Sequence, residues 1–160
     1  MFRRHSPIAV VLVAVAAALA FVRPAIAMET SAREAILMDY DTGQILFSKD
    51  ADQPMPPASM TKIMSVFLAF ERLKDGRLKE TDEIPISENA WRKGGSKMFV
   101  EVGSRVPVSD ILQGIIVQSG NDATIALAEA IAGSEEAFAD LMTKRAQELG
   151  LTNSTFRNST

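Results

Sequence analysis

Residues 57–70 read Pro-Ala-Ser-Met-Thr-Lys-Ile-Met-Ser-Val-Phe-Leu-Ala-Phe, a proline-led turn followed at once by a long apolar run. Proline stops the preceding structure, and the run behind it predicts a helix that begins at Ser59 and ends near Gly76. Apolar residues occupy nearly every side of this helix, so we expect it to be the most buried helix of the chain. A buried helix is a rigid mount for a catalytic group.

A hydroxyl and an amine stand three residues apart at the start of this helix, as Ser59 and Lys62. Residues at this spacing share one helix face, so the two side chains are within mutual reach. Burial and the positive end of the helix dipole both disfavour a protonated lysine, which would make Lys62 a base for a Ser59 nucleophile. The backbone N–H of Ser59 would also lie where an oxyanion can be bound. Under the structural alternative, Ser59 is an N-cap and Lys62 extends into solvent.

A second candidate is the sequence Ser119-Gly120-Asn121, which lies between two expected helices. In a loop that faces the first pair, Ser119 could relay a proton and Asn121 could bind a substrate amide. Under the alternative interpretation, Gly120 ends one helix and Asn121 is the N-cap of the next. Ser87 begins the same serine-x-asparagine spacing, but it follows an expected surface connection. We therefore favour Ser119, because flanking helices can hold its loop rigidly.

Other segments predict a hairpin before the long helix and further helices after it. Short Asx side chains bond their own backbone in turns, which explains Asp39 and Asp41 better than a catalytic carboxylate pair does. Ser134 and Gly150 have the positions of an N-cap and a C-terminal stop. The expected elements are strands at 35–38 and 44–47 around a turn at 39–43, a loop at 90–99, and helices at 109–117, 122–131 and 134–149.

Residues 1–27 have the layout of a secretory signal peptide, with basic residues first, then an apolar run, then small residues that end at Ala27. The run covers about 15 residues, whereas a membrane span needs roughly 20. We therefore expect cleavage after Ala27 and export across the inner membrane. The protein would then reside in the periplasm, on or near the outer face of that membrane.

Removal of the signal takes away three of the 17 basic residues and none of the 20 acidic ones, so the net charge becomes −6. A polyanion such as nucleic acid is therefore not an expected partner. His5, the only histidine, is lost with the signal, and the chain has no cysteine. These absences exclude a Ser-His-Asp triad, a cysteine nucleophile, an imidazole-bound zinc site and disulfides within this sequence. Lysine remains as the base for a hydroxyl nucleophile, and no cofactor or metal is implied.

Five motifs follow one another in order between about Ala35 and Thr160. They are Asp41-Thr42-Gly43, Pro57-Ala58-Ser59-Met60-Thr61-Lys62, Gly94-Gly95-Ser96-Lys97-Met98-Phe99, Gln118-Ser119-Gly120-Asn121-Asp122-Ala123 and Leu149-Gly150-Leu151-Thr152-Asn153-Ser154-Thr155-Phe156. Together they resemble the serine penicillin-binding proteins and β-lactamases. The resemblance is strongest to the D-alanyl-D-alanine carboxypeptidases of low molecular mass, because glycine at position 120 is similar to their form of the loop.

The resemblance implies an α/β fold of the β-lactamase/transpeptidase-like type, with an antiparallel sheet flanked by helices and a helical subdomain. It implies that Ser59 attacks the carbonyl between the last two D-alanines of a peptidoglycan pentapeptide stem while Lys62 takes the proton. Ser119 would relay a proton to the leaving D-alanine, and Asn121 would hold the substrate amide. β-Lactam antibiotics would acylate the same serine.

The chain departs from the family because it contains no Lys-Thr-Gly, a triplet that the family carries downstream of the serine-x-asparagine loop. We therefore expect residues 28–160 to be the amino-terminal part of a catalytic domain and to be inactive by themselves. The remaining strands, a second oxyanion donor and any carboxy-terminal membrane-attaching segment would be missing. The alternatives are a β-lactamase or D,D-endopeptidase of the same fold, or a non-catalytic muropeptide- or penicillin-binding module.

Overall fold

The computed structural model describes residues 28–160, which divide into two compact units at residues 55 and 56. The expected signal peptide at 1–27 lies outside the described residues. The first unit carries a β-hairpin, and the second carries the helices. Between residues 28 and 160, none of the helices combines the length and the apolar character needed to cross a membrane.

The first unit is the hairpin that the sequence predicts. Strands β1 (Ala35–Met38) and β2 (Ile45–Lys49) pair in antiparallel fashion. The Asp39 carboxylate accepts hydrogen bonds from the backbone N–H and the hydroxyl of Thr42, at 2.8 and 2.5 Å. These bonds lower the pKa of Asp39, and Gly43 completes the turn with a φ of 70°. The assignment of Asp39 to turn chemistry is confirmed.

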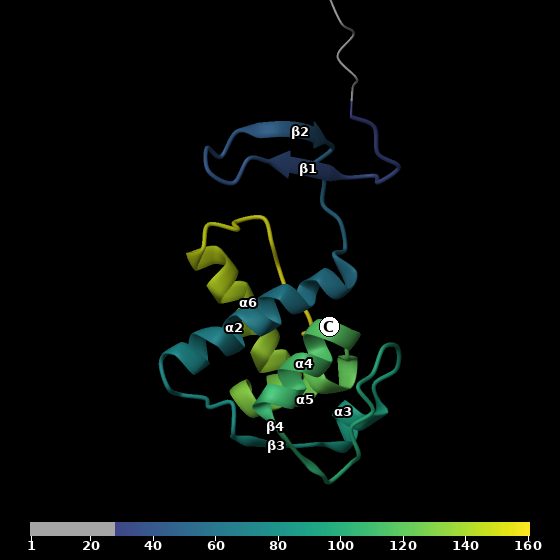
Figure 1. Ribbon diagram of the computed structural model, residues 1–160, viewed down its shortest axis with the longest axis vertical. Helices are drawn as coiled ribbons and strands as arrows, with labels where there is room; N and C mark the ends of the chain where they lie inside the picture. The colour runs from purple at the N-terminus through teal and green to yellow at the C-terminus, as the bar shows by residue number, and fades with distance from the viewer. Residues whose placement is uncertain (1–27) are drawn as a thin grey trace, which may run out of the picture. The chain divides into compact units, whose positions relative to one another are not determined.

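The second unit contains a short 3-10 turn, five α-helices and a two-stranded antiparallel sheet whose strands are separated by one of the helices (Figure 1). In β3 and β4, Ile84 lies opposite Val106 in an antiparallel pair. The elements are η1 (Ala58–Thr61), α2 (Lys62–Lys74), β3 (Glu83–Pro85), α3 (Glu88–Arg92), β4 (Arg105–Pro107), α4 (Val108–Gln118), α5 (Asn121–Ala132) and α6 (Glu135–Glu148).

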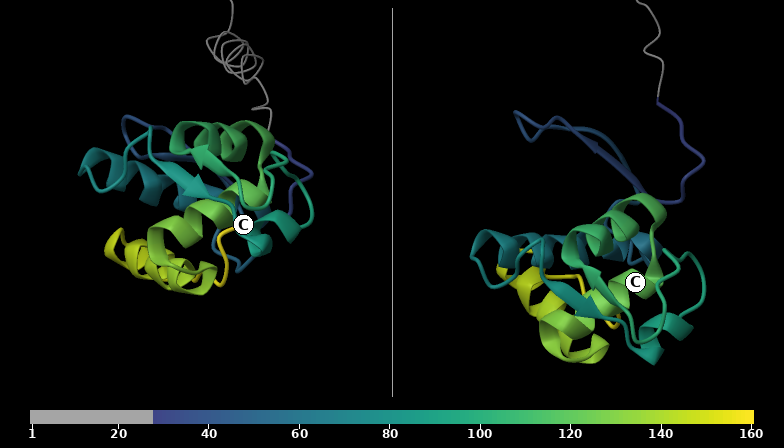
Figure 2. Two further views of the ribbon diagram at one scale, coloured as in Figure 1. Left: turned by 90° about the horizontal axis from the view of Figure 1, so that it is seen from below. Right: turned by 60° about the horizontal axis from the view of Figure 1, so that its bottom comes forward.

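The most enclosed element is α5, which contacts α2, α3, α4, α6 and β3 (Figure 2). Every residue from Asp122 to Ala128 is buried, and the small alanines of this helix let its neighbours approach closely. The expectation that the helix after Ser59 is the most buried is therefore wrong. One face of α2 is buried, but Ile63 and Phe70 on its other side are 73% and 49% exposed.

Two boundaries also differ from expectation. The α-helix begins at Lys62 rather than Ser59, because the preceding turn has 3-10 geometry. Residues 90–92 belong to α3 rather than to a loop, since the Ser87 hydroxyl caps this helix by accepting the N–H of Ala90 at 3.0 Å. The cap expected at Ser134 is confirmed by the same kind of bond, from the N–H of Ala137 at 3.1 Å.

The buried side of α2 is joined to residues far along the chain. Its Ser65 hydroxyl, fully buried, donates a 2.7 Å hydrogen bond to the carbonyl of Ser159. The backbone N–H and the hydroxyl of Ser159 donate in turn to the Glu135 carboxylate on α6. Residues near 159 are thereby fixed against two helices of the second unit.

Candidate active site

Ser59 and Lys62 meet at the junction of η1 and α2. The Lys62 Nζ atom lies 3.2 Å from the Ser59 Oγ atom, so the contact expected from their spacing is present. Ser59 is exposed, whereas only 5% of Lys62 is accessible. Neither η1 nor α2 has a side-chain N-cap. The alternative in which Ser59 caps the helix and Lys62 extends into solvent is therefore wrong.

The surroundings of Lys62 favour its neutral form. Burial lowers the pKa of Lys62, and the nearby cation of Lys93 lowers it further. Across residues 28–160, the ion pairs formed do not include Lys62, so no carboxylate offsets these two effects. A larger fraction of Lys62 consequently carries a free lone pair close to the Ser59 hydroxyl.

The backbone is strained on both sides of this pair. Ala58, directly before Ser59, has a φ of 49°, and Ser119 has a φ of 55°. A residue with a β-carbon pays roughly 1–2 kcal/mol in this left-handed region. Such strain persists where surrounding contacts hold it and is concentrated at functional sites.

Ser119 and Asn121 lie at the corner where α4 meets α5. Ser119 itself ends α4, Gly120 occupies the N-cap position of α5, and Asn121 is the first helical residue. The Asn121 side chain caps nothing, because its Nδ2 atom donates to the carbonyl of Gly94 at 2.8 Å. The alternative that treats Gly120 as the stop and Asn121 as the N-cap is wrong.

This corner is held by the segment 94–96, which the sequence predicts as part of a loop and as part of one of the five motifs, but without a role in the site. The Asn121 N–H donates to the Ser96 carbonyl at 2.8 Å, next to the bond between its side chain and Gly94. Between them Gly95 has a φ of 83°, and a β-carbon there would lie 2.7 Å from the Asn121 Nδ2 atom. The available signal was the pair of adjacent glycines, which permits a close approach of backbone to a side chain.

The hydroxyl and amine groups open into one hollow of about 450 Å³ in the second unit. Ser59, Lys62 and Ser119 all line it, so the structure brings together three of the four predicted site residues. Asn121 is not among the lining residues and stands two positions beyond Ser119. The other lining residues are apolar side chains of α2 and α4: Ile63, Val66, Phe67, Phe70, Ile115 and Ile116.

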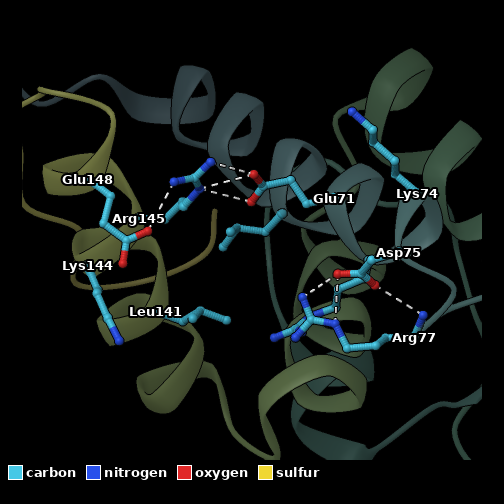
Figure 3. A pocket seen from close by; sticks show the side chains of 10 residues that line it. Glu71, Lys74, Asp75, Arg77, Leu141, Lys144, Arg145 and Glu148 are labelled. Carbon is cyan, nitrogen blue, oxygen red and sulfur yellow. Dashed lines mark hydrogen bonds and ion pairs between the residues drawn. The ribbon is translucent and has the colours of Figure 1, made fainter.

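A second hollow of about 550 Å³ lies between the carboxyl-terminal half of α2 and α6 (Figure 3). Arg145 bridges Glu71 and Glu148 there, at 2.7 and 3.0 Å, and Arg77 pairs with Asp75. The residues that line this hollow include no hydroxyl or thiol, so they offer no nucleophile. In the part of the chain that the structure describes, no group of three or more His, Cys, Asp or Glu side chains is placed to hold a metal.

Comparison with known proteins identifies the relatives of this chain. The family model for D-alanyl-D-alanine carboxypeptidases, peptidase family S11, matches residues 21–160. The D-alanyl-D-alanine carboxypeptidase DacF of Bacillus subtilis is 46% identical over 129 residues, which are 81% of this chain and 33% of that protein. The chain thus spans about one third of the length of the curated relatives it matches.

Solved structures give the same result. The D-alanyl-D-alanine carboxypeptidase DacD from Francisella tularensis matches with a TM-score of 0.82 and 46% identity, over 86% of this chain and 33% of that one. Penicillin-binding protein 5 from Haemophilus influenzae matches with a TM-score of 0.80 and 40% identity, over 84% and 40% of the two chains. The α/β fold expected from the sequence is thereby confirmed.

Proposed function

Because this chain belongs to the D-alanyl-D-alanine carboxypeptidase family, we propose that it carries the nucleophile and base of a serine peptidase that removes the terminal D-alanine from peptidoglycan stem peptides. The observation that carries this proposal is the 3.2 Å contact between the exposed Ser59 hydroxyl and the buried Lys62 amine. A hydroxyl is a weak nucleophile until an adjacent base removes its proton.

In the proposed acylation step, neutral Lys62 accepts the Ser59 proton as Oγ attacks the carbonyl carbon of the penultimate D-alanine. The C–N bond then breaks, and the departing D-alanine amine takes up a proton. Water adds to the resulting ester in the second step, which releases the shortened peptide and restores the Ser59 hydroxyl. The lowered pKa of Lys62 suits this role, because the amine must be uncharged to accept a proton.

Ser119 and Asn121 take the supporting roles in this proposal. Ser119 shares the hollow with Ser59 and Lys62, so its hydroxyl is suited to relay a proton to the leaving amine. The Asn121 side chain commits an N–H to Gly94, which leaves its carbonyl oxygen for a substrate N–H.

The same proposal covers ligands and location. β-Lactam antibiotics present a reactive carbonyl to the same serine, and the expected signal at 1–27 would deliver the protein to the periplasm, where peptidoglycan stems are found. A buried lysine in contact with an exposed serine favours a catalytic site over the alternative of a non-catalytic binding module, because binding alone does not require an uncharged amine.

Labelling with a fluorescent penicillin tests the nucleophile. The protein produced from its own gene should be labelled at Ser59, and Ser59→Ala should abolish the label. The wild-type protein should also release D-alanine from a pentapeptide. Thr143→Val, a substitution on α6 outside the candidate site, is the control for a substitution that does not touch the nucleophile. Label that persists in Ser59→Ala and maps to Ser119 or Ser87 would contradict the assignment.

The lifetime of the penicilloyl-enzyme separates this activity from that of a β-lactamase. A carboxypeptidase should retain the penicilloyl group for minutes or longer. Release within milliseconds would show a β-lactamase instead. D-Alanine release is the matched measurement, since a D,D-endopeptidase would cleave crosslinked peptides and leave the pentapeptide intact.

A further inference from the structure

Asp122 is a buried carboxylate that binds a cluster of backbone N–H groups. It is 1% exposed and lies in the first turn of α5. Its Oδ1 atom accepts the N–H groups of Met98 and Ala123 at 3.0 and 2.9 Å. Its Oδ2 atom accepts those of Phe99 and Val100 at 3.0 and 3.3 Å. Three of these four donors lie 22 to 24 residues earlier in the chain.

These bonds explain why a carboxylate is placed at this position. A buried charge without partners is strongly unfavourable, and among residues 28–160 the ion pairs do not include Asp122. Four N–H donors satisfy both carboxylate oxygens instead, at the positive end of the α5 dipole. An asparagine of the same size would offer one acceptor oxygen, and its NH2 group would face N–H donors.

The turn that Asp122 holds continues directly from the segment that binds Asn121. Gly94 and Ser96 accept the side-chain and backbone N–H groups of Asn121, and the residues held by Asp122 begin two positions later, at Met98. Gly120 fits tightly between them, since a β-carbon there would lie 3.0 Å from the Asp122 Oδ1 atom and 3.1 Å from the Met98 nitrogen.

Resting on the proposed carboxypeptidase function, we infer that Asp122 is a positioning residue. It fixes the turn at 98–100, and through the neighbouring segment 94–96 it fixes the orientation of the Asn121 amide. Asp122 does not touch the substrate. Its effect reaches the reaction through the placement of Asn121.

The backbone conformation of Phe99 is independent evidence that the turn at 98–100 is strained. Its φ is 63°, in the left-handed region, and the residue is 81% exposed. Burial therefore does not hold this residue in place. The bond from its own N–H to Asp122 is the contact that opposes the strain. Without the carboxylate, Phe99 is expected to return to an ordinary conformation and to shift the segment before it.

The first experiment compares Asp122→Asn with Thr143→Val in the protein produced from its own gene. The Thr143 hydroxyl on α6 donates to the Phe156 carbonyl and accepts the Phe156 N–H, so its loss removes hydrogen bonds in which the 94–100 segment takes no part. Asp122→Asn should lower the maximal rate of D-alanine release by ~100-fold, the scale of an ångström-sized misplacement. Thr143→Val should lower the melting temperature without this loss. Equal rates in the two variants would overturn the inference.

A double-variant cycle with Asn121→Ala tests the route of the effect. If Asp122 acts through Asn121, then Asp122→Asn should slow the reaction much less in the Asn121→Ala background than in the wild type. Fully multiplicative effects would mean that Asp122 does not act through Asn121, which would overturn the inference.

Amide hydrogen exchange separates failure of this inference from failure of the proposed function. The N–H groups of residues 98–100 should be protected in the wild type and should exchange faster in Asp122→Asn, whether or not the protein hydrolyses D-alanyl-D-alanine. Unchanged exchange would overturn the inference. Should Asp122→Asn not fold, Phe99→Gly/Asp122→Asn removes the left-handed strain. If that variant also fails to fold, Asp122 has only a structural role, and the inference is wrong.

Discussion

The two sides of the candidate site are built in different ways. Ser59 and Lys62 are three residues apart, and their contact follows from local helical geometry and an apolar wall. Asn121 is held by Gly94, which lies 27 residues earlier, and by a turn that depends on Asp122. The first side therefore depends on the chemistry of two side chains, whereas the second depends on the fit of two distant backbone segments.

This difference predicts how each side responds to substitution. Changes at the serine–lysine side should affect protonation and leave the fold intact. Changes at the Ser119–Asn121 corner should affect geometry while the pKa of Lys62 stays the same. Three substitutions test the comparison, in order of decreasing expected effect.

Replacement of Lys62 by arginine should have the largest effect. A guanidinium group stays protonated and cannot accept the Ser59 proton, although it keeps the positive charge. Loss of a general base costs about 100- to 10,000-fold in rate, so acylation by a fluorescent penicillin should fall by this factor. Lys97→Arg, at a residue that donates to the Trp91 carbonyl, is the matched control. An arginine variant that keeps most of its rate would show that Lys62 supplies charge or packing rather than base catalysis.

Replacement of Gly95 by alanine should have an intermediate effect on the other side of the site. The new β-carbon would meet the Asn121 amide at 2.7 Å in a backbone conformation that alanine adopts poorly. We expect roughly a 10-fold loss in maximal acylation rate, with an unchanged pH dependence, since displaced positioning groups slow the reaction without altering the base. Gly43 also has a left-handed φ, but no atom lies within 4 Å of the β-carbon that Gly43→Ala would add. This variant therefore measures the effect of backbone strain without a steric clash. A change in the pH profile of Gly95→Ala would show that the Asn121 corner influences the pKa of Lys62, which would contradict the proposed independence of the two sides.

Replacement of Lys93 by methionine should have the smallest effect, and it should appear in the pH dependence. The Lys93 cation is the second cause of the lowered pKa of Lys62, so its removal should raise that pKa. Acylation requires the neutral amine, hence the rising limb of the rate profile should move to higher pH. The rate at high pH, where Lys62 is neutral in both proteins, should be nearly unchanged. A shift to lower pH would mean that Lys93 does not act on Lys62 by charge repulsion.

How far the sequence predicts this molecule depends on how local each feature is. The Ser59–Lys62 contact and the cap at Ser134 follow from spacings of three residues, and both are found. The adjacent glycines at 94 and 95 indicate a close approach of backbone to some side chain, but neither they nor the helix-starting Asp122 indicate which residue more than 20 positions away is the partner. Short strands such as β3 cannot be predicted from the sequence pattern either. Three residues, one of which is Pro85, are too few to show an alternation of apolar and polar side chains.

The exposed side of α2 differs from the sequence prediction for a related reason. An apolar sequence predicts that a helix will be buried, but it does not predict which faces of the helix are covered by other segments. In the second unit, the alanine-rich α5 became the centre because small side chains permit contact on every side. Chain-wide packing, rather than hydrophobicity, decides which helix is enclosed.

The bond from Ser65 to Ser159 has a consequence for biosynthesis. Ser65 lies one turn beyond Lys62, yet its partner is made 94 residues later. At ribosomal speeds of about 5–20 residues per second, roughly 5–20 s pass before the helix that bears Lys62 can complete its packing. The growing chain therefore contains Ser59 and Lys62 well before the packing behind Lys62 can be complete. The helix that carries the base reaches its final packing only after residue 159 has been made, so the pair is expected to become competent after that residue rather than when Lys62 itself is added.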